Sequence, residues 1–274
     1  MTVNMPATDA DGAAETIAAA FVAARRGALP LLEYPGRVPA SLDDGYRIQD
    51  LAIALQGDAV AGWKVGRIWP PAAMVFGSNR LAGPIFAPAM VAAGGDTVMP
   101  VFVGGFGAVE AEFIYRLGIV DPADRQYSLA EAKACVTGVH YGIEIASSPL
   151  GAINDLGPAV TVSDFGNNHG LIVGPVIENW QDVDFDAWPI EVEIDGSTAG
   201  TGTAADFPDG SLGSVRFLLE LLARRGIAVP QGTLVSTGAI TGVHAIAAGQ
   251  SSVVRFADRQ SLSCRISKAE PTSK

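Results

Sequence analysis

The chain has little cysteine and little positive charge for its 274 residues. Its two cysteines, Cys135 and Cys264, stand far apart in apolar surroundings, so they predict neither a thiolate metal site nor a disulfide framework. Only 18 residues are Lys or Arg against 29 Asp or Glu, which gives a formal net charge of −11. This excess of negative charge argues against nucleic acids and anionic membranes as partners.

Long hydrophobic runs are also missing. No apolar stretch approaches the roughly 20 uncharged residues that a membrane-spanning helix needs. The segment Met1–Asp11 carries two acidic residues and no basic one, so it does not predict a signal peptide. We therefore expect a cytoplasmic protein. Apolar residues still make up 49% of the chain, which is enough for a large core or a buried oligomer interface.

The pattern of residues divides the chain into a helical region over 1–58 and a larger body over 59–274. Alanine-rich periodicity predicts a helix over 13–26, and Ser41 is a suitable N-cap for a second helix that ends near Gly57. The body predicts short strands between Gly- and Pro-containing turns, with two further helices. The strands are expected at 60–66, 108–117, 139–146, 170–177, 189–195, 233–237 and 252–256, and the helices at 128–135 and 211–225. This is an α+β pattern, since strands and helices do not alternate regularly.

Three glutamates occupy strand-like positions among apolar residues. Glu110 and Glu112 must point to the same face of a strand, because side chains alternate along it. Glu144 lies between two isoleucines about thirty residues later. Buried carboxylates need a neutralising cation, and a cluster of oxygen ligands suits a hard divalent metal such as Mg²⁺ or Mn²⁺. The alternative is that these glutamates line a solvated edge or face of a sheet.

Lys64 lies in the short run Gly62-Trp-Lys-Val-Gly66. A lysine beside a tryptophan on a buried strand is expected to be partly desolvated, which would lower its pKa and suit acid–base catalysis. An ordinary lysine with its ammonium group in water is the alternative.

The segment Ser163–Gly170 concentrates polar residues and glycines between two apolar runs. Such a composition is typical of a loop that presents backbone N–H and amide groups to an anion. A plain surface turn would have the same composition.

Taken in order, five motifs resemble the 2-keto-4-pentenoate hydratase and 4-oxalocrotonate decarboxylase family of the fumarylacetoacetate hydrolase superfamily. The resemblance runs from about Gly45 to the C-terminus. The motifs are Gly62-Trp-Lys-Val-Gly66, Val109-Glu-Ala-Glu-Phe113, Gly142-Ile-Glu-Ile145, Asp164-Phe-Gly-Asn-Asn-His-Gly170 and Leu234-Val-Ser-Thr-Gly238.

The resemblance implies a β-rich fumarylacetoacetate-hydrolase-like body with a small N-terminal helical region, assembled as a homo-oligomer. It implies a lyase that acts on a small unsaturated 2-oxo acid through an enolate stabilised by Mg²⁺ or Mn²⁺, and a complex with a homologous pathway enzyme. The site residues that it implies are Glu110, Glu112 and Glu144 as metal ligands, Lys64 as the acid–base residue, and Asn167, Asn168, His169 and Thr237 at the substrate.

One departure from the family pattern leaves the reaction open. Relatives carry an acidic residue before an apolar strand, where this chain reads Phe76-Gly-Ser-Asn-Arg-Leu-Ala-Gly-Pro-Ile-Phe86 and has no acid. Hydration needs a second acid–base group, whereas decarboxylation chiefly needs an electron sink and a proton. Hydratase, decarboxylase, C–C bond hydrolase and a catalytically weak partner of an active homologue all remain alternatives.

Overall fold

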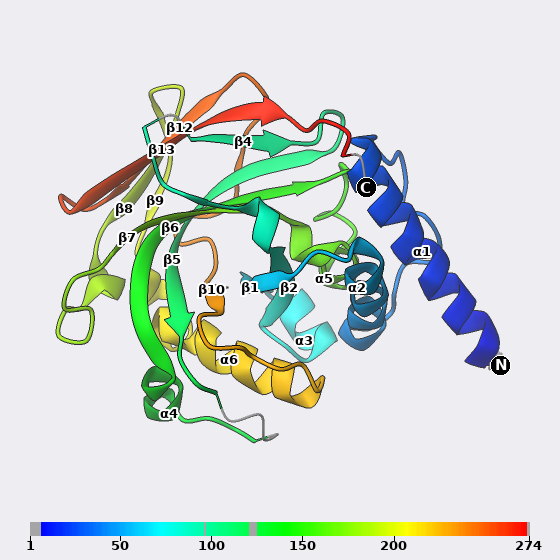
Figure 1. Ribbon diagram of the computed structural model, residues 1–274, viewed down its shortest axis with the longest axis horizontal. Helices are drawn as coiled ribbons and strands as arrows, with labels where there is room; N and C mark the ends of the chain where they lie inside the picture. Colours follow the sequence, from blue (N-terminus) through cyan, green and yellow to red (C-terminus); the bar gives the residue numbers. More distant parts are fainter. Residues whose placement is uncertain (1–6, 96, 121–124, 273–274) are drawn as a thin grey trace.

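Two β-sheets and six α-helices form the part of the chain that the structure describes (Figure 1). The computed structural model of the protein describes residues 7–95, 97–120 and 125–272. The eight strands of the larger sheet are β1 (Val60–Arg67), β2 (Arg80–Phe86), β3 (Met90–Ala92), β5 (Phe106–Leu117), β6 (Val136–Ser148), β7 (Asn168–Val176), β10 (Leu234–Ser236) and β11 (His244–Ala245). The smaller sheet consists of β4 (Val98–Val101), β8 (Ile190–Ile194), β9 (Ser197–Gly202), β12 (Ser251–Phe256) and β13 (Gln260–Lys268). The helices are α1 (Ala7–Gly27), α2 (Leu42–Gln56), α3 (Ala72–Phe76), α4 (Leu129–Ala134), α5 (Pro158–Ser163) and α6 (Gly210–Arg224).

The larger sheet is built around the long antiparallel pair β5 and β6. Its strand order is β2-β1-β10-β5-β6-β7-β3, and β11 pairs with the start of β5. Strands β1 and β10 run parallel, as do β3 and β7, while the neighbouring pairs β10 and β5, β5 and β6, and β6 and β7 are antiparallel. This order brings the lysine strand, the two-glutamate strand and the Glu144 strand into one continuous surface.

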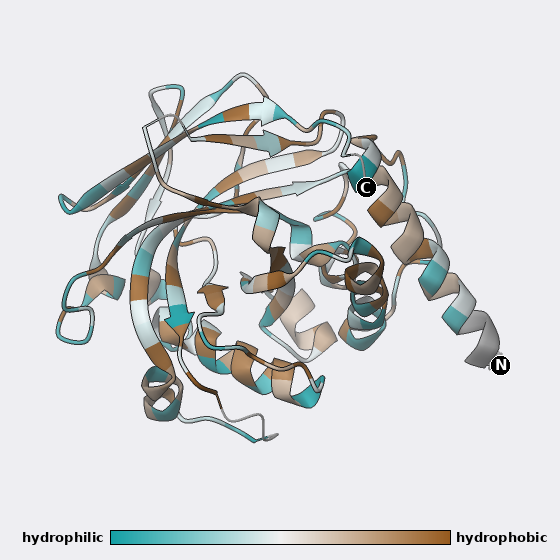
Figure 2. Ribbon diagram, viewed as in Figure 1, coloured by the Kyte–Doolittle hydropathy of each residue, from teal (hydrophilic) through white to brown (hydrophobic). Residues whose placement is uncertain are grey.

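One face of β5 is apolar and packs into the main hydrophobic core. Val109, Ala111 and Phe113 are fully buried there, and the Phe113 ring lies 5.8 Å from that of Phe256 in the smaller sheet. Helix α6 adds a row of leucines to the same core, and apolar residues recur along it in Figure 2. Because this face is closed by hydrophobic packing, the glutamates between these residues must project to the opposite face.

The two N-terminal helices share a second hydrophobic core with the body. Helix α2 begins after Ser41, whose hydroxyl accepts a hydrogen bond from the Asp44 amide at 3.1 Å, and it ends at Gly57 in the left-handed conformation. Phe21 of α1 is fully buried in a cluster that also contains Phe165 of the body. The N-terminal helices therefore pack directly on the segment that contains Phe165. The expected division of the chain at residue 58 stays a prediction.

The structure confirms the α+β class and the strands and helices expected from the sequence, with ends shifted by a few residues. The elements that the sequence did not predict are β2, β3, β4, β9, β11, β13, α3 and α5. Strand β2 was missed because Pro84 within it argues against a strand. The proline is tolerated because β2 is the last strand of its sheet and pairs on one side only, with β1. Pro100 occupies a similar place in β4, at the edge of the smaller sheet. Among the described helices, none has the length and apolar content to cross a bilayer.

Gly83 of β2 is the point where this edge strand meets the segment before β7. A Cβ atom at this position would lie 2.0 Å from the carbonyl oxygen of Phe165, which is backbone and cannot turn aside. We expect Gly83→Ala to lower the free energy of unfolding by roughly 1–3 kcal/mol, measured by urea denaturation. The matched control is Gly12→Ala in α1, where nothing lies within 4 Å of the added atom. A Gly83→Ala protein as stable as the unsubstituted chain would contradict this close packing.

Candidate metal centre

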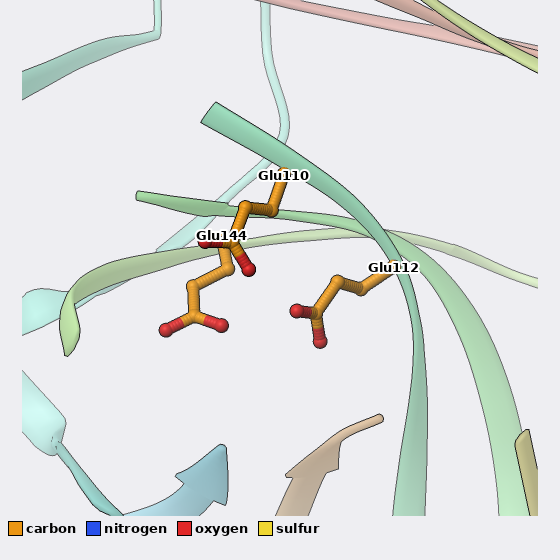
Figure 3. Close-up of side chains that lie close together, drawn as sticks. All are labelled: Glu110, Glu112 and Glu144. Carbon is orange, nitrogen blue, oxygen red and sulfur yellow. The ribbon is translucent and has the colours of Figure 1, made fainter. Parts of the chain in front are cut away.

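Three buried carboxylates converge on the face of β5 and β6 that lies away from the main core. Glu110 is the direct partner of Glu144 across the two strands, and Glu112 follows two residues along β5. One oxygen from each group lies within 4.8 Å of the others, and Figure 3 shows the three side chains turned toward a common space. Their exposed fractions are 4% for Glu110 and 0% for Glu112 and Glu144. The alternative of a solvated edge or face is therefore wrong.

The carboxylates are not neutralised by their protein neighbours alone. Burial raises the pKa of Glu110 to about 7, and burial together with the charges of Glu144 and Glu110 raises the pKa of Glu112 well above its ordinary value. Glu112 Oε2 accepts hydrogen bonds from the Ser236 hydroxyl and the Gly238 amide. The other oxygen of Glu112 and Oε2 of Glu144 have no hydrogen-bond partner among the described residues. Buried orphan oxygens within reach of one another fit a hard divalent cation.

Lys64 of β1 provides the positive charge nearest to these carboxylates. Its Nζ lies 3.2 Å from Glu144 Oε1, and the side chain is 6% exposed. Burial by itself would lower the pKa of Lys64, but the charges of Glu144, Glu110 and Glu112 outweigh it and raise the pKa. The expectation of a lowered pKa was therefore wrong, because the carboxylates that β5 and β6 bring to β1 could not be weighed from the lysine motif alone. Lys64 carries a proton in this structure.

The segment before β7 contributes two asparagines to the same site. Asn168 donates a hydrogen bond from Nδ2 to Glu144 Oε1 at 2.9 Å. Asn167 lines a cavity of about 430 Å³ together with Lys64 and Glu110. Both asparagines are buried, so the segment is not a surface turn. The structure thus places Asn167 and Asn168 beside the carboxylates.

His169 does not line the cavity that contains Lys64, Glu110 and Asn167. The register between β6 and β7 shifts at this point, and the His169 ring packs 4.4 Å from the Phe102 ring, beside Arg25. It lines a different cavity of about 360 Å³. Burial, and then the charge of Arg25, lower the pKa of His169 to about 3, so the imidazole is neutral near pH 7. The expectation of a titratable group at the substrate is corrected by this placement.

Thr237 follows β10 and lies beside the site rather than in the larger cavity. It is 1% exposed, and its hydroxyl donates a hydrogen bond to the Phe113 carbonyl at 2.9 Å. It lines a small cavity with Arg80, and this cavity shares Gly66 and Arg67 with the larger one. Its contact with a substrate stays a prediction.

Arg80 occupies the strand where relatives were expected to carry an acid. The side chain is buried and donates hydrogen bonds to the Pro208 carbonyl and the Ser214 hydroxyl. On β2 it lies directly opposite Arg67 of β1. This end of the site is therefore cationic.

Sequence reasoning missed Arg25 of α1, which donates hydrogen bonds to both carboxylate oxygens of the fully buried Asp164. The two residues are 139 positions apart, so no local motif joins them. A signal was nevertheless present. Arg25 follows Phe21 and Ile17 at four-residue spacing, which puts it on the buried face of an amphipathic helix. A charged residue at such a position requires a buried partner.

Comparisons with known proteins find relatives in the family that the motifs resemble. No family model matches the chain. Over 104 residues it is 35% identical to 4-oxalocrotonate decarboxylase from Pseudomonas putida and 31% identical to that of Pseudomonas sp. (strain CF600). Each match covers 38% of this chain and 39% of the relative, so the chain matches about two fifths of the length of these curated relatives.

Solved structures extend the likeness over nearly the whole chain. The 4-oxalocrotonate decarboxylase from Pseudomonas putida G7, complexed with magnesium and adipate, superposes with a TM-score of 0.76 at 20% identity and covers 97% of this chain and 100% of its own. The chain has the fold of 4-oxalocrotonate decarboxylase. The predicted family resemblance is confirmed. A fumarylpyruvate hydrolase from Pseudomonas aeruginosa, in complex with Mn²⁺ and pyruvate, superposes less closely, with a TM-score of 0.54, 21% identity and coverage of 75% of this chain and 88% of its own.

Glu112→Gln tests the metal centre, because it removes one ligand charge without changing the shape of the side chain. We expect the affinity for Mn²⁺ to fall roughly 100-fold or more, measured by isothermal titration calorimetry. The unfolding free energy measured in EDTA should not fall, because the substitution replaces a buried ionisable group. Glu33→Gln is the control, since Glu33 is exposed and outside the site. Unchanged Mn²⁺ affinity in Glu112→Gln would remove Glu112 from the ligand set.

Proposed function

We propose that this protein is a divalent-metal-dependent lyase that decarboxylates a small unsaturated 2-oxo acid. One observation carries the proposal. Three buried carboxylates, two of which have an oxygen without a hydrogen-bond partner among the described residues, lie next to Lys64, and Glu110 and Lys64 both line the same cavity of about 430 Å³. The relatives named 4-oxalocrotonate decarboxylase support the choice of substrate class.

Glu110, Glu112 and Glu144 are the residues that would hold the cation. A bound Mg²⁺ or Mn²⁺ would supply a Lewis acid that stabilises negative charge on the keto oxygen of a 2-oxo acid. The same cation would resolve the electrostatic problem of an anionic substrate entering a protein with a net charge of −11. Asn168 orients Glu144 through its hydrogen bond, and Asn167 faces the cavity in which the substrate would lie.

Lys64 supplies the proton that a decarboxylation requires. Loss of CO₂ leaves an electron pair on the carbon chain, and the reaction ends when a proton is delivered to carbon. The ammonium group of Lys64 is held at the cavity wall by Glu144, and its raised pKa keeps it protonated near neutral pH. Lys64 therefore carries a proton before the reaction begins. A cation bound to the three carboxylates would offset the negative charge that raises the pKa of Lys64, and would bring that pKa closer to the range in which an ammonium group gives up its proton.

Hydration and C–C bond hydrolysis fit the cavity less well. Both need a group that positions and deprotonates water. The ionisable residues in the described lining of the cavity are Lys64, Arg67 and Glu110, and Glu110 is assigned to the metal. No second carboxylate remains in this described lining to act on water. The residue composition therefore favours decarboxylation over hydration.

Arg67 marks the remote end of the cavity as a site for a second anionic group. Its guanidinium carbon lies 3.6 Å from the centroid of the Trp69 ring, and its Nη1 donates a hydrogen bond to the Asp206 carbonyl at 3.4 Å. Lys64 and Arg67 line the same cavity and lie three residues apart on β1. A 2-oxo acid held beside Lys64 would therefore present a carboxylate at its far end to Arg67.

The reaction is tested by incubating the Mg²⁺-loaded protein with unsaturated 2-oxo acids, and following CO₂ release together with dienol absorbance. We expect CO₂ release, and a fall in kcat of roughly 100-fold or more in Lys64→Met, because the proton donor is lost. Lys64→Met should still bind Mn²⁺. Water addition without CO₂ release would identify a hydratase. Metal binding with no turnover of any 2-oxo acid would favour a catalytically weak partner of a homologue.

Arg67→Leu tests the remote end of the substrate. We expect KM for a 2-oxo dicarboxylate to rise roughly tenfold, since one charge-assisted contact is lost, while KM for the matching 2-oxo monocarboxylate changes little. Arg37→Leu removes the same charge from an exposed position and serves as the control. An equal change in KM for both substrates would show that Arg67 does not read the second carboxylate.

We also propose, as expected from the sequence, that the protein is a cytoplasmic homo-oligomer that forms a complex with a homologous pathway enzyme. Trp69, Met74 and Val75, which lie within seven residues of one another, are exposed at 61%, 76% and 77%, and exposed apolar side chains grouped in this way support an assembly.

A further inference from the structure

The segment between α5 and β7 has a strained backbone. Phe165, Gly166 and Asn167 have φ angles of 54°, 65° and 66°, so three consecutive residues adopt the left-handed region and two of them are not glycine. L-residues avoid this region because Cβ crowds the backbone. Such a run persists only when its surroundings hold it in place, and strain of this kind concentrates at functional sites.

On the cavity side, the segment is pressed against the strands that carry the site. A Cβ atom at Gly166 would lie 3.0 Å from Gly83 Cα and 3.1 Å from Lys64 Cδ. The backbone of the segment therefore rests on β2 and on the aliphatic stem of the catalytic lysine. This steric contact limits where the segment can move. It does not by itself stabilise the left-handed conformation, which requires attractive contacts.

On the opposite side, Arg25 of α1 binds both ends of the segment. Its guanidinium group donates to both carboxylate oxygens of Asp164, and Nη1 donates to the Asn168 carbonyl at 3.1 Å. Nη2 also donates to the Ser147 carbonyl on β6 at 3.1 Å. The guanidinium carbon lies 5.0 Å from the centroid of the Phe165 ring, between these two ends.

The Asp164 carboxylate is held from β6 as well. The Ser148 hydroxyl donates to Asp164 Oδ2 at 2.6 Å, and Asp164 is fully buried. The side chain of Arg25 is 8% exposed. The planar guanidinium group donates two parallel hydrogen bonds to the carboxylate, and this bidentate contact fixes the orientation of Asp164 as well as its distance. The single ammonium group of a lysine could not do so.

We propose that Arg25 is a positioning residue of the site. From the N-terminal helix it holds Phe165–Asn167 in the left-handed conformation, which presents Asn167 to the cavity and Asn168 to Glu144. Arg25 does not reach the carboxylates of the metal centre itself, and it acts through the hydrogen bond from Asn168 to Glu144 Oε1. The effect on metal binding rests on the proposed function, whereas the effect on the segment does not.

The first test compares Arg25→Lys with Arg26→Lys by hydrogen–deuterium exchange of the metal-free protein. Arg26 is the matched control, because it lies on the same helix and donates to carbonyls at the end of α2, not to the segment. We expect amide exchange in residues 164–168 to accelerate at least tenfold in Arg25→Lys, with β12 and β13 unchanged, and no change in Arg26→Lys. Equal exchange in the two variants would overturn the proposal.

The second test measures Mn²⁺ affinity in a double-mutant cycle. Arg25→Lys and Asn168→Ala should each lower the Mn²⁺ affinity about tenfold. The double variant should also lose only about tenfold, because both substitutions act through one contact. Fully additive losses would overturn the route through Asn168. If Arg25→Lys fails to fold, Asp164→Asn removes the same ion pair and should give the same results.

The two tests separate this inference from the proposed function. An unsubstituted protein without Mn²⁺ affinity would refute the metal centre, and the exchange comparison would then decide the role of Arg25 alone.

Discussion

The site depends on one electrostatic constraint, which is the burial of three carboxylates around a single ammonium group. Lys64 balances one negative charge, and the remaining carboxylates are kept close together by the fixed pairing of β5 with β6. The side chains of Lys64 and the three glutamates have little exposed surface, so each charge acts strongly on its neighbours. The charges of the glutamates raise the pKa of Lys64, whereas burial is the largest cause of the raised pKa values of Glu110 and Glu112. The site is therefore poised to accept positive charge.

Much of this arrangement was predictable where a local rule applies. Alternation along a strand put Glu110 and Glu112 on one face, and the apolar flanks of Glu144 indicated burial. Ser41 marked the start of a helix through its own side chain. Each of these inferences uses residues within a few positions of one another, so nothing distant could overrule them.

Where the prediction failed, a distant part of the chain decided the outcome. The pKa of Lys64 is raised by glutamates on other strands, and the strand character of Arg80–Phe86 depends on its place at the edge of the sheet. His169 was expected at the substrate, but its ring packs against Phe102 beside Arg25 and lines a cavity other than the one that contains Lys64 and Glu110. The role of Arg25 required knowledge of which helix packs on which loop.

The ion pair between Arg25 and Asp164 also has a consequence for biosynthesis. During translation the arginine leaves the ribosome 139 residues before its carboxylate partner, and the strands that carry Lys64, Glu110, Glu112 and Glu144 emerge between the two. Helix α1 therefore cannot form the ion pair between Arg25 and Asp164 until most of the larger sheet has been synthesised. Contacts of such long sequence separation slow folding. Completion of the site is thus a late event, in which α1 packs on the segment before β7 after the intervening strands have been made.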